Sequence, residues 1–162
     1  MPAKPITIVG GGLAGLTLGI ALRQREIPVT IHEAGHHPRH RVCGEFISGR
    51  GQETLARLGL RELLDRAGAV RANNAAFFSE TNSMPSRPLP SSAICLSRFD
   101  LDHALAGELR RLGGELREST RWREEFGEGI VRATGRRLKT EPNGNRWFGL
   151  KIHVRNVPLN AD

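Results

Sequence analysis

The sequence feature that most constrains the fold is a glycine-rich turn between two short β-type segments. Residues 5–9 (PITIV) favour a strand, and the turn GGGLAG follows at residues 10–15. Residues 13–25 then repeat apolar side chains at helical intervals, and residues 28–33 (PVTIHE) favour a second strand. This order, within about thirty residues, predicts a βαβ unit with a parallel sheet.

The glycine spacing G-x-G-x-x-G predicts a phosphate-binding turn for a dinucleotide. Gly10 would make the tight turn, Gly12 would let the backbone approach a pyrophosphate, and Gly15 would allow close helix–strand packing. The helix that begins there directs its positive end and free N–H groups at the phosphates. Glu33, at the end of the next strand, is expected to accept hydrogen bonds from the adenosine ribose. The predicted cofactor contacts of this unit are Gly10, Gly12, Leu13, Ala14, Gly15 and Glu33.

Length and composition narrow the class of protein. A chain of 162 residues with 38% hydrophobic and 25% charged residues is expected to form one globular domain. The net charge of +7 raises nucleic acid as a partner, but the arginines are scattered and no aromatic residues are interleaved among them. We therefore expect no nucleic acid. The absence of a long apolar run or a signal peptide predicts a cytoplasmic protein without a transmembrane segment.

The remaining elements are expected from local pattern. Residues 35–48 are expected to form a loop, and 81–92 a turn-rich surface excursion. A further helix is predicted from an N-cap at Asp100 to the glycine pair Gly113-Gly114. The other predicted helices are 50–59 and 61–67, and the other predicted strands are 74–79, 93–97, 115–118, 129–133 and 148–154.

The cysteines and the clustered histidines predict neither a disulfide framework nor a metal site. Cys43 and Cys95 are too few and too isolated for a disulfide framework or a zinc ribbon. His36, His37 and His40 lie in a charged loop without a cysteine or acid at matching spacing, so no metal site is expected.

Five stretches, in order, resemble one family of flavoproteins. The opening IVGGGLAGLTLGIALRQREIPVTIHE is similar to the FAD-binding N-terminus of the class A flavin monooxygenases and the related geranylgeranyl reductases and flavin halogenases. The segment RVCGEFIS (41–48) resembles the reductase-like branch. The segments SRFDLDHAL (97–105), ATGRR (133–137) and FGLKIHV (148–154) resemble later motifs of the group. The resemblance runs from about residue 5 to residue 154.

The resemblance implies FAD as the cofactor rather than NAD alone, with NAD(P)H as reductant and a small apolar or aromatic molecule as substrate. It places Arg41 near the flavin and Arg98 near the ribityl–pyrophosphate part, with Thr134 and Gly135 beside the cofactor. Cys43 and Gly44 would lie close to the flavin ring. No catalytic residue is assigned, because in a flavoenzyme the cofactor carries the chemistry.

The expected fold class is α/β: a Rossmann-like FAD/NAD(P)-binding domain, in which a parallel sheet with flanking helices is joined by a small β segment. Residues 1–147 would form this domain, and 148–162 the start of a substrate-side sheet. Nothing in residues 155–162 resembles the family's second cofactor motif. The family also has a β-hairpin before the strand that ends in the ATGRR-like motif, and residues 118–132 are short for such a hairpin. We expect a truncated chain, which either belongs to an FAD-dependent oxidoreductase or is a non-catalytic remnant that needs a partner chain.

Overall fold

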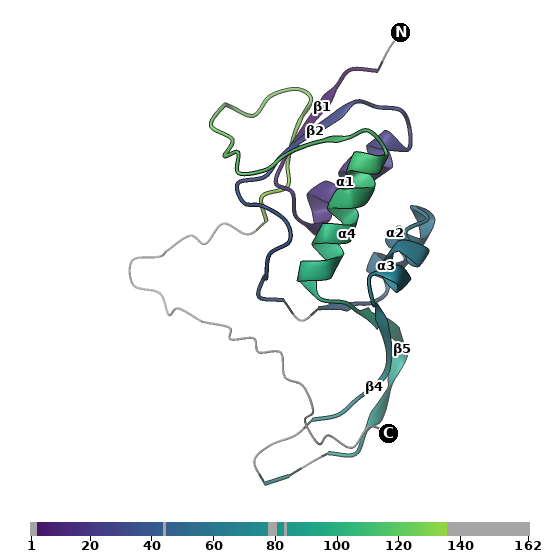
Figure 1. Ribbon diagram of the computed structural model, residues 1–162. Coiled ribbons are helices and arrows are strands. Elements are labelled where there is room, and N and C mark those ends of the chain that lie inside the picture. The colour runs from purple at the N-terminus through teal and green to yellow at the C-terminus, as the bar shows by residue number, and fades with distance from the viewer. Residues whose placement is uncertain (1–2, 44, 78–80, 83, 136–162) are drawn as a thin grey trace.

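The first sheet of the molecule is parallel throughout. The computed structural model describes residues 3–43, 45–77, 81–82 and 84–135. Four strands lie in the order β6-β2-β1-β7, so both neighbours of β1 are reached by crossovers (Figure 1). The strands are β1 (Ile6–Val9), β2 (Val29–His32), β6 (Glu115–Arg117) and β7 (Ile130–Arg132). This confirms the βαβ unit and the Rossmann-like α/β class.

Two helices pack on this sheet and on each other. α1 (Leu13–Arg23) joins β1 to β2, and α4 (Arg98–Arg111) precedes β6. They meet at Gly19 of α1, where an added Cβ would lie about 3 Å from side-chain carbons of both Ile31 and Leu109. Because Gly19 has no side chain, α1 can pack closely against both the sheet and α4 at this point.

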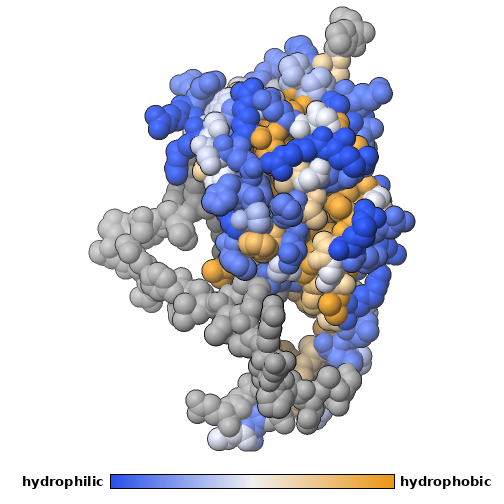
Figure 2. All heavy atoms as spheres, viewed as in Figure 1, coloured by the Kyte–Doolittle hydropathy of each residue, from blue (hydrophilic) through white to orange (hydrophobic). Residues whose placement is uncertain are grey.

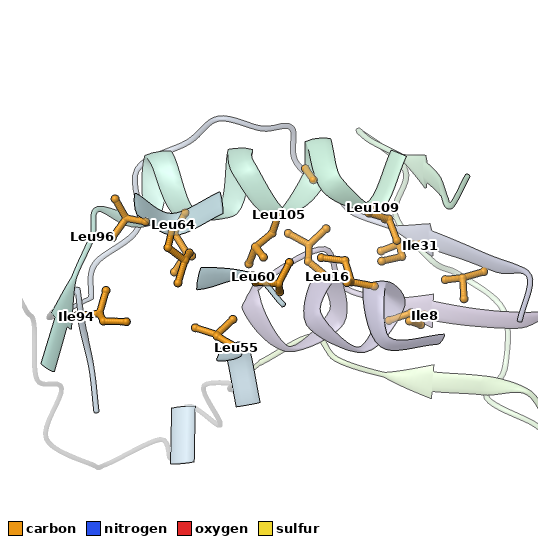
Figure 3. Close-up of a cluster of buried hydrophobic side chains, with 14 residues drawn as sticks. Ile8, Leu16, Ile31, Leu55, Leu60, Leu64, Ile94, Leu96, Leu105 and Leu109 are labelled. Atoms are coloured by element: carbon orange, nitrogen blue, oxygen red, sulfur yellow. The ribbon is translucent and has the colours of Figure 1, made fainter. Parts of the chain in front are cut away.

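A second, antiparallel sheet extends away from the first (Figure 1). Its strand order is β3-β5-β4, with β3 (Phe46–Ile47), β5 (Arg87–Cys95) and β4 (Val70–Ala75). Between β3 and β4 lie the short helices α2 (Arg50–Arg57) and α3 (Arg61–Arg66). Figure 3 shows one continuous apolar core that joins α2, α3 and β5 to α4, α1 and the parallel sheet.

Two of the predicted β segments were wrong in position. The strand expected at 74–79 begins at Val70 and ends at Ala75. The strand expected at 93–97 is only the end of β5, whose first six residues lie in the excursion expected at 81–92. The prolines that suggested a loop are tolerated because β3 pairs only with Ile94 and Cys95 among the described residues. Pro88 and Pro90 thus lie where β5 has β4 alone as a neighbour, next to a register shift.

The start of α4 was predicted three residues late. Ser97, not Asp100, is the N-cap: its hydroxyl accepts a hydrogen bond from the backbone N–H of Asp100 (3.1 Å) and donates to the Asp100 carboxylate (2.5 Å). Asp100 thus stands at the third helical position, where a capping box has its acid, and its carboxylate here pairs with the Ser97 hydroxyl. The loop predicted at 35–48 also contains β3 at its end.

The other sequence predictions fall into two groups. The helices at 50–59 and 61–67, and the end of α4 at Gly113, are confirmed. The predicted strand at 148–154 and the domain boundary at 147/148 lie outside the described residues. Within the part of the chain that the structure describes, no helix is long and apolar enough to span a membrane.

Candidate functional site

The glycine turn between β1 and α1 is closely surrounded by backbone. Gly10 has φ +115°, and a Cβ there would collide with the carbonyl of Ala133 at the end of β7. A Cβ on Gly15 would collide with the carbonyl of Gly10. Both positions therefore require glycine, the first for the turn and the second for packing α1 against β1, as the spacing predicted.

Gly12 differs from its neighbours because it has room. It is the N-cap of α1 in extended conformation (φ −85°), and a Cβ there would meet only the Arg98 guanidinium at 3.8 Å. Within the described part of the chain no side chain caps α1, so the N–H groups at its start can serve another partner. This is the geometry of an anion-binding helix start.

Glu33 follows β2 and is held beside the glycine turn. Its side chain is 6% exposed. The backbone N–H of Gly11 donates to Oε2 and that of Gly35 donates to Oε1, both at 2.8 Å. The Arg39 guanidinium donates to Oε1 at 2.5 Å. The predicted ribose acid is thus fixed to the turn before any ligand arrives.

A chain of alternating charges runs from this acid to α4. Arg41 lies 3.8 Å from Oε2 of Glu33 through Nη2 and 3.6 Å from Oδ2 of Asp102 through Nε. Asp102 is fully buried and receives two hydrogen bonds from Arg98, at 2.8 and 2.7 Å. We call this set the charge chain; in order, its members are Arg39, Glu33, Arg41, Asp102 and Arg98.

The charge chain shifts the pKa values of its members. Burial alone would raise the pKa of Glu33, but the N–H groups of Gly35 and Gly11 and the two arginines lower it below its usual value. Burial and then the charge of Arg39 lower the pKa of Arg41, against the two carboxylates. Hydrogen bonds to Asp102 raise the pKa of Arg98, against burial. Three cations and two anions leave an excess positive charge, which suits a phosphate.

A second polar cluster fixes the glycine turn from the side of β6. The backbone N–H of His37 donates to Glu118 at 2.6 Å, and Nδ1 of its ring lies 2.8 Å from the same oxygen. Nε2 lies 2.8 Å from the carbonyl of Gly11. The two nitrogens on opposite sides of the His37 ring thus bridge Glu118 and the glycine turn. Arg110 completes the cluster through Glu118 (2.7 Å).

These elements surround a cavity of about 620 Å³ at the carboxyl end of the parallel sheet. Most of the predicted site residues line it, namely Gly10, Gly12, Leu13, Ala14, Glu33, Arg41, Arg98, Thr134 and Gly135. Gly15 is buried beneath the turn and Cys43 is not in the lining. Gly44 lies outside the described residues. The other eight lining residues were not predicted as contacts: Val9, His32, Ala34, Arg39, Thr120, Arg121, Trp122 and Ala133.

Some of the missed residues had a signal in the sequence. Asp102 lies on α4 next to Leu101 and on the stripe of Leu105, so an acid on a buried helix face should have indicated a buried cation. Arg98, four residues earlier, is that cation. Trp122 lies in an irregular segment, where no periodicity could reveal it.

Histidines of the loop at 36–40 make structural contacts, such as the bridge of His37 between Glu118 and Gly11. No cluster of three or more metal-ligating side chains occurs among the described residues. The His40 ring stacks on Phe99 with centroids 4.7 Å apart. Glu45 accepts a hydrogen bond from the backbone N–H of Arg98 (2.8 Å), so it positions the start of α4.

Comparison with known proteins supports the Rossmann-like fold and FAD as the cofactor. The chain is 26% identical over 127 residues to conditioned medium factor receptor 1 of Dictyostelium discoideum, which covers 71% of this chain and 25% of the receptor. It is 42% identical over 60 residues to kynurenine 3-monooxygenase of the same organism, covering 35% of this chain and 13% of that enzyme. The crystal structure of CmlS, a flavin-dependent halogenase, superimposes with a TM-score of 0.61 at 29% identity.

The structural match covers 76% of this chain but only 24% of the halogenase, so the chain spans about a quarter or less of these relatives. A family model described as the FAD binding domain matches residues 4–143. That range includes the glycine turn, Glu33 and the whole described cavity lining. The chain therefore belongs to the FAD-binding domain family, and its cofactor is FAD.

Proposed function

We propose that this chain provides the dinucleotide-binding part of a flavin-dependent oxidoreductase of the monooxygenase type. The observation that carries the proposal is the hydrogen bond that fixes Glu33 to the glycine turn in the wall of the cavity. The N–H groups that begin α1, together with Arg98, would hold the pyrophosphate, and Glu33 would hold the ribose. The proposed cofactor contacts are Gly10, Gly12, Leu13, Ala14, Gly15, Glu33, Arg41, Arg98, Thr134 and Gly135.

The residues present fit such a ligand. The open space at Gly12 lies where the backbone must approach the pyrophosphate, and no side chain caps the helix there. The excess positive charge of the charge chain suits the phosphates. Buried guanidinium nitrogens of Arg39 and Arg41 (Nε in each) have no hydrogen-bond acceptor among the described residues. The cavity therefore supplies donors and cations for an anionic ligand.

FAD, when bound, supplies the redox chemistry, and this chain binds and orients it. Kynurenine 3-monooxygenase and the halogenase CmlS favour the oxygen-using branches of the resemblance. We propose NAD(P)H as the reductant and a small apolar or aromatic substrate. The reductase-like reading of residues 41–48, with Cys43 and Gly44 near the flavin, stays a prediction.

We also propose that further polypeptide, in the same or a partner chain, completes the enzyme. The relatives are about four times longer than their matched part or more. Several large apolar side chains are exposed among the described residues: Val42, Phe46, Val70, Phe77, Met84 and Phe126. Figure 2 shows apolar surface beside strongly hydrophilic surface on one face of the molecule. Such surface suits a protein contact.

We propose a cytoplasmic location for the complete protein.

A glycine substitution separates FAD binding from folding. In G12A the new Cβ meets the Arg98 guanidinium only at ordinary contact distance, so the fold should be retained. The methyl group would stand where the pyrophosphate must approach the backbone. We expect the purified wild-type chain to gain thermal stability on addition of FAD and to show flavin absorption after gel filtration. G12A should lose both effects.

Gly107 offers the matched control. It lies within α4, and a Cβ there meets nothing within 4 Å. G107A should bind FAD as the wild type does. A wild-type chain that FAD does not stabilise would refute the proposed function. Equal FAD affinity in G12A and the wild type would refute the assignment of the pyrophosphate to this turn.

A further inference from the structure

His32 and Trp122 form an aromatic corner of the cavity that none of the roles above explains. Their rings meet edge to face, with centroids 4.9 Å apart, and both residues line the cavity. Nδ1 of His32 and Nε1 of Trp122 are buried, and neither has a hydrogen-bond partner among the described residues. A buried polar group left unpaired costs about 1–3 kcal/mol. Two such groups at one corner indicate a ligand that would pair with them.

The corner is held in place by backbone hydrogen bonds rather than by its own side chains. His32 is the last residue of β2, and its carbonyl accepts from the N–H of Gly10 at 2.8 Å. The segment before Trp122 is fixed to the turn after β2, because Thr120 N–H donates to the Glu33 carbonyl at 2.8 Å. Ser119 N–H donates to the Gly35 carbonyl at the same distance. The two ring nitrogens are therefore available in a preformed site.

The place of the corner in the cavity identifies what it would contact. The glycine turn is suited to the pyrophosphate, and Glu33 to the ribose of the adenosine. His32 is adjacent to Glu33 in sequence, and Trp122 is tied to the Glu33 backbone through Thr120. The group beyond the ribose in a dinucleotide is the purine base. The corner therefore adjoins the acid suited to the ribose, and the base is the group bonded directly to that ribose.

The chemistry of the corner matches that base. An indole N–H can only donate, so Trp122 requires an acceptor such as a purine ring nitrogen. Burial, and next the charge of Arg117, lowers the pKa of His32, which favours a neutral ring. A neutral imidazole nitrogen can accept from an exocyclic amine. An aromatic side chain also offers a stacking surface, worth about 1–3 kcal/mol per base.

We propose that His32 and Trp122 bind the adenine base of the cofactor, with Trp122 as the main determinant of affinity for the adenosine half. The proposal rests on the FAD-binding function above and extends it to residues that sequence motifs do not mark. Trp122 would thus bind the cofactor, although it lies in an irregular segment that no sequence motif marks.

Tryptophan fluorescence tests this proposal directly. The chain contains two tryptophans, so W147F leaves Trp122 as the single emitter. ADP carries the base, ribose and pyrophosphate but no flavin, and inorganic pyrophosphate carries no base. ADP should change the emission of Trp122 in W147F, and pyrophosphate should leave it unchanged. FMN, which lacks adenine, should not compete with ADP for the corner.

Variants at Trp122 supply a second measurement in the same full-length chain. Calorimetric titration should give about tenfold or greater loss of ADP and FAD affinity in W122L, from the stacking energy above. W122F, which keeps an aromatic face but lacks the N–H, should lose less. Circular dichroism and a thermal melt establish that each variant is folded.

The outcomes separate this proposal from the proposed function. If the wild type binds FAD but W122L binds FAD and ADP equally well, or ADP leaves Trp122 emission unchanged, the adenine assignment is wrong and the function stands. If the wild type binds neither FAD nor ADP, both are wrong.

Discussion

The substitution G15A tests how tightly α1 is seated on β1. Gly15 lies in the first turn of α1, and an added Cβ would come well within 3.0 Å of the Gly10 carbonyl oxygen and 3.3 Å from a methyl carbon of Ile8. The Gly10 backbone cannot easily yield, because its N–H donates to His32 and its Cα faces Ala133. Relief therefore requires α1 to move away from the sheet.

The magnitude follows from two opposing effects. Overpacking costs about 1–3 kcal/mol, and the upper part of that range, about 2–3 kcal/mol, applies here because the added Cβ meets backbone rather than a flexible side chain. Replacing glycine by alanine within a helix returns about 1 kcal/mol at most. We expect G15A to lower the free energy of unfolding by about 1–2 kcal/mol, and the melting temperature by roughly 2–8 °C for a chain of this size.

Gly107 again supplies the control, since it is helical and has open space around its Cα. G107A should gain about 0.5–1 kcal/mol from helix propensity alone, and its melting temperature should rise by roughly 1–4 °C. Thermal melts and urea titrations of both variants, followed by far-ultraviolet circular dichroism, measure the difference. If G15A is as stable as the wild type while G107A gains as expected, the close approach of α1 to β1 is wrong.

Three further predictions concern the polar groups of the site. D102N leaves Arg98 without its buried carboxylate and should destabilise the fold by about 3 kcal/mol in urea titration, whereas E62Q on the exposed face of α3 should change little. The pKa values of Glu33 and Glu118 in the folded protein lie below the usual 4.5. The two ionised carboxylates therefore stabilise the fold above about pH 4.5, and this contribution is lost as the pH falls through their folded-state pKa values. E118Q should flatten the decline in unfolding free energy between pH 5 and 3, and an unchanged decline would contradict the shift. H37Q replaces the two nitrogens on opposite sides of the ring by a single amide nitrogen, which cannot reach both Glu118 and the Gly11 carbonyl. It should therefore speed hydrogen exchange at the Gly11 N–H; unchanged exchange would contradict the bridge.

Sequence reasoning succeeded where one local stretch contains the whole signal. The strand, glycine turn, helix and Glu33 all lie within the first third of the chain, and their roles depend on spacing along it. The glycine at position 15 was assigned to packing, and its surroundings in the fold confirm this. The N-cap at Ser97 could also have been predicted from the serine three residues before an acid, but Asp100 was predicted as the cap instead.

Sequence reasoning failed where pairing between distant segments decides the outcome. β4 contains two asparagines and β5 two prolines, and they form strands because they pair with each other across a register shift. Arg132, a charged residue within β7, is exposed, and its guanidinium lies 4.0 Å from the centroid of the Phe126 ring. Neither pairing can be inferred from local pattern.

The shared position of Arg41 has an evolutionary consequence. Since this guanidinium lies within 4 Å of both Glu33 and Asp102, the loss of either carboxylate changes the electrostatic balance at the other. Substitutions at positions 33, 41, 98 and 102 should then be epistatic, with double-mutant effects that differ from the sum of the single ones. Among related sequences these four positions should covary, so that a lineage that neutralises Asp102 also replaces an arginine beside it.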